Sequence, residues 1–233
     1  MRVWDKSLTA AQVRVLAQSL ATGTVAPTLS ATSAVTVDQG AQLKVTGPGH
    51  EVGSLDGTGT VDIDSFSSLR VNGNVTFTDT LVGNGTLILP SGANLSGVSA
   101  GNFWGVVRAE GGTVTLGSSF ANSMLSVASG AKATGTVRLV AVADGYAVTT
   151  DGADTGLPVI SATGRVAIPA TGSVTFTSPP KAGFHVLMEG TSFDEPTDYS
   201  GWTVSGTGYA PRFMVDGGRF KLLLNGGVTI IIR

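Results

Sequence analysis

The stretch Gly59-Thr60-Val61-Asp62-Ile63 decides the fold, because the chain returns to its pattern at regular intervals. The pattern is Gly-Thr, an aliphatic residue, any residue and a second aliphatic residue. Further copies occupy Gly85–Leu89, Gly112–Leu116 and Gly135–Leu139, and a looser copy occupies Gly172–Phe176. The first two intervals are 26 and 27 residues, and the third is 23. Short alternating strands with such a period are typical of stacked repeat folds.

Aliphatic residues around the motif keep the same spacing, which suggests how the copies stack. We therefore expect residues 26 apart to be vertical neighbours, with the aliphatic side chains pointing inward. The two predicted inner columns are Val35, Val61, Leu87, Val114 and Val137, and next to them Val37, Ile63, Leu89, Leu116 and Leu139. The motif threonines Thr60, Thr86, Thr113 and Thr136 should line the outer face. The motif glycine should turn a corner at positive φ, which only glycine adopts at low cost.

This repeat resembles the autotransporter-associated and pectin-lyase-like repeats. The resemblance implies an extracellular setting and a single-stranded right-handed parallel β-helix, also called a β-solenoid. The expected fold class is therefore all-β, with the parallel β-helix over residues 33–190. The paired Asp motifs, Gly-His-Gly and Arg-x-Lys of polysaccharide-cleaving relatives are absent from the sequence. That departure argues against carrying their enzymatic activity over to this chain.

Residues 1–32 differ from the repeat and are expected to form a strand, a capping helix and a linker. Thr9 and Gln12 have capping-box spacing, and an apolar stripe runs through Val13, Leu16, Ala17 and Leu20. The segment Arg2–Val13 resembles the closing strand and helix of laminin-G-like (concanavalin-type) domains. That resemblance implies a piece of a larger surface protein. The alternative is an ordinary capping helix with a chance match.

Residues 191–233 are expected to form a C-terminal antiparallel cap. Three strand candidates, 212–215, 219–224 and 228–232, are separated by Asp216-Gly217-Gly218 and Asn225-Gly226-Gly227. Asp-Gly and Asn-Gly are strong hairpin signals. The last candidate, Val228–Ile232, is apolar enough to be a sticky edge unless it packs on the final coil.

Composition narrows the function classes. The net charge of −2 argues against nucleic acid, which needs a basic footprint. The chain has no Cys, and no apolar run is long enough to insert into a membrane. Only 13% of residues are charged, while Gly reaches 33 residues. A surface poor in charge and rich in Thr, Ser, Asn and Gly favours a secreted or cell-surface protein, although the N-terminus lacks a secretory signal pattern.

Three carboxylates provide the first candidate site. The 26-residue register stacks Asp38 on Asp64, and Asp62 lies on the same outer face. Such a group could bind a glycan or calcium, or act as an acid–base pair. The alternative is a solvated face, because Lys44 and Arg70 share the same period and would form a compensating basic column.

A second candidate lies in the acidic segment that precedes Trp202. Asp194, Glu195 and Asp198 could stiffen a loop by binding calcium, the one cofactor that the sequence suggests. Trp202 could then offer a ring for sugar stacking. The alternative is a solvated loop with Trp202 in the core of the terminal sheet. The two histidines, His50 and His185, are far apart in sequence and are expected on the surface or in loops.

Two functional hypotheses follow. The first is a non-enzymatic, exported β-solenoid that acts as a structural stalk or adhesion module of a larger surface protein, with glycans or other surface proteins as partners. The second is a polysaccharide-binding or polysaccharide-cleaving β-helix that uses the acidic face at Asp38, Asp62 and Asp64. No catalytic residue is assigned under the first hypothesis.

Overall fold

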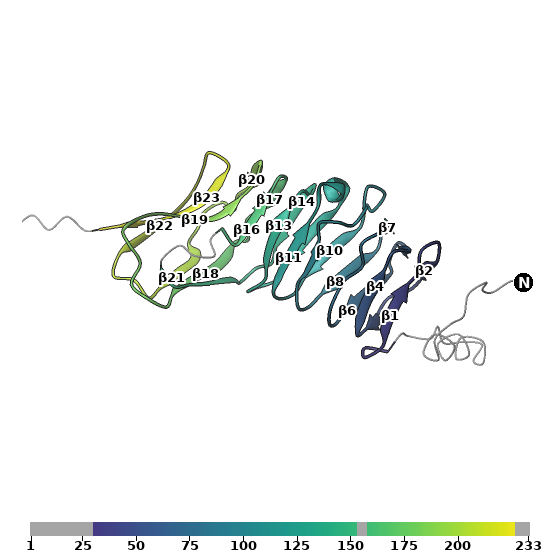
Figure 1. Cartoon of the computed structure of the whole chain (residues 1–233). Coiled ribbons are helices and arrows are strands. Elements are labelled where there is room, and N and C mark those ends of the chain that lie inside the picture. Colours follow the sequence, from purple (N-terminus) through teal and green to yellow (C-terminus); the bar gives the residue numbers. More distant parts are fainter. Residues whose placement is uncertain (1–29, 153–157, 227–233) are drawn as a thin grey trace, which may run out of the picture.

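The computed structural model describes residues 30–152 and 158–226, and they form an all-β structure. The strands belong to five sheets and are stacked along one long direction, from β1 near the N-terminal end to β22 at the other (Figure 1). One short 3-10 helix, η1 (Ser118–Asn122), interrupts them. The described part of the chain contains no α-helix. The capping helix expected within residues 1–32 lies outside the described residues.

The long sheet has eight strands, and every neighbouring pair is parallel. Its strands in chain order are β3 (His50–Val52), β6 (Ser68–Val71), β8 (Thr86–Leu89), β10 (Val106–Ala109), β12 (Met124–Val127), β14 (Leu139–Val142), β17 (Arg165–Ala167) and β20 (Ser192–Asp194). This ladder runs through most of the length of the molecule and gives it its elongated form (Figure 1).

The seven-stranded mixed sheet combines parallel and antiparallel pairs. Its parallel strands are β9 (Ala93–Leu95), β11 (Thr113–Leu116), β13 (Lys132–Gly135), β16 (Ile160–Ala162) and β19 (Gly183–Glu189). The hairpin β22 (Ala210–Asp216) and β23 (Arg219–Asn225) then pairs antiparallel to β19. This hairpin confirms two of the three strands expected near the C-terminus. The third, Val228–Ile232, lies outside the described residues.

Three small parallel sheets complete the walls. They are β1 (Ala34–Val37) with β4 (Ser54–Gly57), then β2 (Gln42–Val45), β5 (Thr60–Ile63) and β7 (Thr80–Gly83), and finally β15 (Tyr146–Thr150), β18 (Thr171–Phe176) and β21 (Gly201–Ser205). Because β20 pairs in parallel with β17 and β21 pairs in parallel with β18, the parallel sheets continue beyond residue 190, where the sequence placed the boundary of the cap. Among the described residues, the antiparallel pairs are β19 with β23 and β22 with β23.

The predicted 26-residue register is wrong for the columns named above, although β14 with β17 and β15 with β18 do pair at that offset. Ala34 pairs with Ser54 and Thr60 pairs with Thr80, so paired residues are twenty apart in sequence. This separation increases toward the C-terminal end, where Ala133 pairs with Ile160. Val37, Ile63 and Leu89 lie in three different sheets and form no column. The other predicted inner column and the threonine column fail for the same reason, because their members lie on different sheets.

The 26-residue interval has a simple geometric origin. The chain returns to the same sheet after about twenty residues in the N-terminal half, and six more residues carry it to the next strand. Successive motif copies therefore begin β5, β8 and β11, each on a different sheet. In these three copies the motif marks the entry into a strand, whereas the copy Gly135–Leu139 connects the end of β13 to the start of β14.

The inner face of the long sheet carries the core. Its aligned side chains are 2% exposed or less: Leu69, Leu87, Val107, Leu125, Val140 and Val166. Burying each such side chain contributes about 1.5–3 kcal/mol before the loss of conformational entropy is counted. Alternation of residues in these strands directs every second side chain outward.

The motif glycines serve mainly for close packing. Gly59 and Gly85 do not have positive φ, contrary to the expectation from sequence. A Cβ on Gly85 would lie 2.5 Å from the backbone oxygen of Asp64, and one on Gly59 would lie 2.4 Å from that of Asp38. Since atoms cannot approach so closely, the preceding strand turn excludes any side chain at these corners. Positive φ does apply at Gly112 and Gly135.

Candidate functional site

The structure separates the three carboxylates of the first candidate site. Asp62 lies on β5 and Asp64 directly follows it, whereas Asp38 follows β1 in another sheet. Asp38 and Asp64 are therefore not stacked, which corrects the register expected from sequence. Lys44 on β2 is the register partner of Asp62, and its Nζ lies 4.0 Å from Asp62 Oδ2 and 3.4 Å from Asp64 Oδ2.

The expected basic column is also absent, because Lys44 and Arg70 lie on different sheets. Arg70 on β6 instead forms a second polar cluster on the long sheet. Its Nη1 lies 2.6 Å from Glu110 Oε2, and its Nε donates to Asn72 Oδ1 at 3.0 Å. Arg108 Nε approaches the other Glu110 oxygen at 3.1 Å. Each acidic group in these two clusters has a basic neighbour, as expected of an ordinary charged surface.

The three carboxylates proposed to hold calcium have different partners. Asp194 Oδ2 lies 3.3 Å from Arg165 Nε, and Glu195 accepts a hydrogen bond from the Tyr199 hydroxyl at 2.5 Å. Asp198 accepts hydrogen bonds from the hydroxyl and the backbone N–H of Ser200, which lower its pKa. Within residues 30–152 and 158–226, no three His, Cys, Asp or Glu side chains gather as a metal site requires.

Trp202, which was considered for sugar stacking, is only 6% exposed. It lies on β21, its indole N–H donates to the Pro169 oxygen at 3.0 Å, and its ring packs against Phe213 and Phe220. The alternative interpretation from sequence, a Trp in the core of the terminal sheet, therefore describes it. The indole face is not available to a ligand.

Both histidines are buried, contrary to the expectation of surface positions. His50 begins β3, and its Nε2 lies 2.8 Å from the Thr46 oxygen. His185 lies on β19, with Nε2 2.9 Å from the Lys181 oxygen and its ring edge-on to Phe176. The two residues belong to different sheets, so they do not converge on one site.

A shallow, open depression of about 400 Å³ lies over the outer face of β13, β16 and β19. Its lining is rich in hydroxyl groups, and the Thr163 hydroxyl donates a hydrogen bond to Thr136 Oγ1 at 2.9 Å. Glu189 is the acidic group of the lining, and Arg219 Nε lies 3.0 Å from one of its oxygens. Because it is open and polar, the depression lacks the enclosed apolar walls typical of small-molecule sites.

A recurring turn reveals residues that the sequence analysis missed. After a strand, the third turn residue takes positive φ in five cases and is glycine each time: Gly40 (76°), Gly92 (82°), Gly112 (61°), Gly130 (79°) and Gly145 (73°). A sixth turn, Asp64-Ser65-Phe66-Ser67, has Phe66 at φ 62° in the same place. A bulky residue with this backbone conformation is an outlier that costs about 1–2 kcal/mol.

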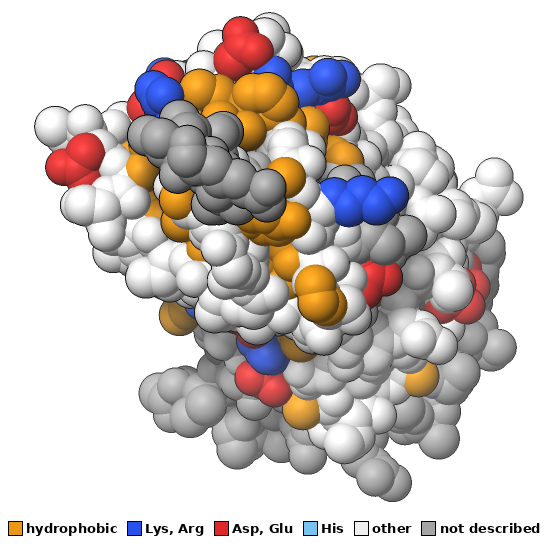
Figure 2. Space-filling model, turned by 90° about the vertical axis from the view of Figure 1, so that its left-hand side faces the viewer, with side chains coloured by type: hydrophobic (Ala, Val, Ile, Leu, Met, Phe, Trp, Pro, Cys, Tyr) orange, Lys and Arg blue, Asp and Glu red, His pale blue; other side chains and the backbone are white. Residues whose placement is uncertain are grey.

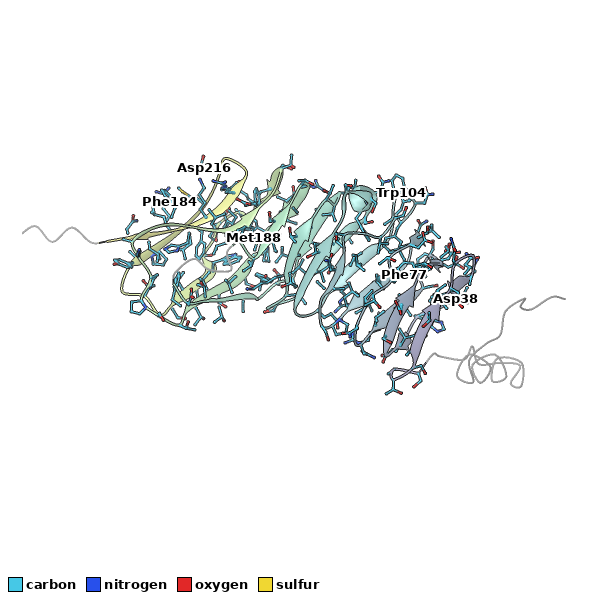
Figure 3. The ribbon with its side chains drawn as sticks, viewed as in Figure 1. Asp38, Phe77, Trp104, Phe184, Met188 and Asp216 are labelled. Carbon is cyan, nitrogen blue, oxygen red and sulfur yellow. The ribbon has the colours of Figure 1, made fainter. Side chains whose placement is uncertain are left out.

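Phe66 is also 96% exposed, and Trp104 is 58% exposed. Both belong to one corner of the molecule, between the sheet of β5 and β7 and the long sheet. Figure 3 shows Trp104 on the same side as η1, toward the N-terminal half. The signal that could have located Phe66 is the alignment of the six turns, in which five have glycine and one has phenylalanine at the third position.

No protein family model, curated protein or solved structure matches this chain. None of the described segments forms a helix with the length and apolar character that crossing a bilayer demands. The surface features on which a function can be argued are thus the paired charges, the hydroxyl-lined depression and the exposed aromatic corner.

Proposed function

We propose that this chain is a non-enzymatic structural stalk or adhesion module of a larger secreted or cell-surface protein. In this proposal its sheets are the walls of a single-stranded right-handed parallel β-solenoid. The right-handed winding follows the general preference of parallel strand crossovers. The observation that carries the proposal is the continuous eight-stranded parallel ladder with its aligned aliphatic interior.

A parallel stack of this kind suits a stalk for a mechanical reason. Each strand is hydrogen-bonded to the strands before and after it, from β3 to β20. The aliphatic side chains behind those hydrogen bonds exclude water along the whole ladder. Bending the stack would open backbone hydrogen bonds and the packed interior together, so the molecule is expected to hold its shape under load.

The second candidate function is a polysaccharide-binding or polysaccharide-cleaving β-helix that uses Asp62 and Asp64. The proximity of these two carboxylates favours it. Lys44 opposes it as an acid–base site, because its Nζ already pairs with both carboxylates, at 4.0 Å from Asp62 Oδ2 and 3.4 Å from Asp64 Oδ2.

The proposal is tested by measuring the shape of the molecule in solution and its activity on polysaccharides. Small-angle X-ray scattering of the full chain should give the distance distribution of a rod, and pulling along the stack should show cooperative resistance. A compact, spherical scattering profile would contradict the stalk. A screen against pectin, alginate, xylan and β-glucans should release no product. Release that depends on Asp64, tested with Asp64→Ala, would establish the second candidate instead.

A further inference from the structure

The turn that carries Phe66, between β5 and β6, is longer than the corresponding turns on the next two levels of the stack. Val45, Ile63 and Gly83 are register partners on β2, β5 and β7, and Phe103 continues the series through an isolated parallel bridge to Gly83. After Gly83 and Phe103, one residue (Asn84 or Trp104) precedes the next corner glycine. After Ile63 there are three residues before Ser67, whose oxygen accepts from Thr86 N–H. Ser65 and Phe66 are therefore two extra residues that project from this corner.

Phe66 gains no packing from this arrangement. Its ring is exposed to solvent, and its backbone adopts the conformation that glycine supplies in the five matching turns. Strain and apolar exposure together are unfavourable for folding and stability alone. A residue that is costly on both counts and is placed at a projecting turn points to a role in binding.

Trp104 lies two strands further along the same corner. The backbone N–H of Asn84 donates to the oxygen of Ile63, and that of Trp104 donates to the oxygen of Gly83. Successive strands are about 4.8 Å apart, so the segments that carry Phe66 and Trp104 are separated by about 10 Å. Between the two aromatic residues lies Asn84, which is exposed. Along the stack, the corner thus presents an aromatic ring, then an amide and then a second aromatic ring.

The chemistry of this corner selects the ligand class. Rings separated by a polar amide do not form the continuous apolar area of a protein interface. Nucleic acid, which also stacks on rings, requires cations for its phosphates, but Lys44 on the adjoining strand is engaged by Asp62 and Asp64. A sugar has both an apolar C–H face for stacking and hydroxyl edges that hydrogen-bond to amides and carboxylates.

We propose that Phe66 and Trp104 form a binding ridge for a neutral, extended glycan, with one pyranose ring stacked on each aromatic side chain. In a β-1,4-linked chain the same sugar face returns at every second residue, a distance similar to the separation of the two segments. Asn84, and Asp64 at the base of the turn, hydrogen-bond to the hydroxyl groups. The inference rests on the adhesive role proposed above and gives that role a ligand class.

The test is calorimetric titration of the full chain with cellohexaose, xylohexaose and mannohexaose. At least one of these β-1,4-linked hexasaccharides should bind, with a Kd in the millimolar range or tighter. Trp104→Ala and Phe66→Gly should each weaken binding at least tenfold, and Phe66→Tyr should retain it. Failure of all three hexasaccharides to bind at millimolar concentration would overturn the inference.

Two further variants separate binding from folding. Phe184 is as exposed as Trp104 (58%) but lies toward the other end of the molecule (Figure 3), so Phe184→Ala should leave affinity within twofold of wild type. Trp104→Phe should retain binding while abolishing the fluorescence change that the sugar causes. Wild-type affinity in Phe66→Gly or Trp104→Ala would reject the ridge. A rod-like scattering profile in those variants would show that the stalk stands independently of it.

Discussion

Phe66 occupies in its turn the position that Gly40 occupies in the turn 26 residues earlier, and both have positive φ, 62° and 76° respectively. In both turns the last N–H donates to the first carbonyl oxygen, Ser67 to Asp64 and Ala41 to Asp38. The two turns thus share a backbone and differ in the residue that must adopt the strained conformation. This difference can be measured.

Phe66→Gly is expected to stabilise the protein by up to about 1 kcal/mol. The substitution relieves the strain of a non-glycine residue at positive φ, and part of that gain is offset by the greater entropy of glycine in the unfolded chain. Urea unfolding should show a higher midpoint with an unchanged m-value. The reciprocal variant Gly40→Ala should destabilise by a similar amount, because its Cβ would meet no atom within 4 Å and only the strain remains. A lower midpoint for Phe66→Gly would refute the strain argument.

Gly85→Ala is expected to destabilise the protein by about 2–3 kcal/mol, because its Cβ would meet the backbone oxygens of Asp64 and Ser67 at 2.5 and 2.7 Å. Those oxygens belong to the preceding strand turn and cannot move without disturbing the ladder. Gly101→Ala is the matched control, since a Cβ there would meet nothing within 4 Å and φ is not positive. Thermal unfolding of both variants would check this, and equal melting temperatures would argue against the close packing.

The burial of the Tyr146 hydroxyl predicts that the protein loses stability at alkaline pH. Burial raises the pKa of its hydroxyl above the ordinary value of 10.0, and the hydroxyl donates to the Ala131 oxygen. The folded state therefore holds this proton more tightly than the unfolded state does. The resulting stability is fully present below about pH 10 and falls as the pH rises further.

Tyr146→Phe should cost about 1 kcal/mol at neutral pH through the lost hydrogen bond, and should flatten the alkaline decline. Part of the decline in stability with pH should remain in this variant, because the pKa of Tyr199 is also raised, by burial and by its hydrogen bond to Glu195. Chemical unfolding between pH 8 and 11 measures both effects. A variant with the same alkaline slope as wild type would show that Tyr146 does not cause it.

Calcium is expected to leave the melting temperature unchanged within about 1 °C. Asp194, Glu195 and Asp198 each have their own partner, namely Arg165, Tyr199 and Ser200. Binding an ion would require all three carboxylates to leave these partners and converge. Differential scanning calorimetry with millimolar CaCl₂, and with EDTA in the control, would detect a stabilised holo-form, which would restore the calcium hypothesis.

The strand segments, the hairpin turn at Asp216–Gly218 and the inward direction of most aliphatic side chains were predictable, because they depend on residues close together in the chain. The positive φ expected at the motif glycines was wrong at Gly59 and Gly85. Val61, Ile63 and Leu87 were expected inside and are buried. The vertical register failed because motif spacing records the next similar corner, which need not lie on the same sheet. Asp38 and Asp64 share a turn pattern but different sheets, and that assignment depends on pairing between distant strands. The exposed corner was missed because an isolated Phe in a repeat resembles another core position.

The C-terminal end shows how an open stack is closed. The hairpin β22–β23 pairs antiparallel to β19, and its rings Phe213 and Phe220 stack at 5.8 Å above Trp202. The end-on view in Figure 2 shows hydrophobic side chains gathered between charged ones. Lys221 Nζ lies 5.7 Å from the centre of the Phe184 ring and 2.6 Å from an Asp216 oxygen, so charge partly covers this surface.

The corner glycines have a consequence for how such a chain can change its length over generations. Because Gly85 fits against the carbonyl groups of one neighbour and Gly105 against the Gly85 oxygen, each level is a template for the next. Deleting one or two residues from a strand would shift the register between that level and all later levels, so that the corner glycines would no longer meet the carbonyl groups of the level before. Related chains are therefore expected to gain or lose whole levels, whereas projecting residues such as Ser65 and Phe66 can change in number without disturbing the stack.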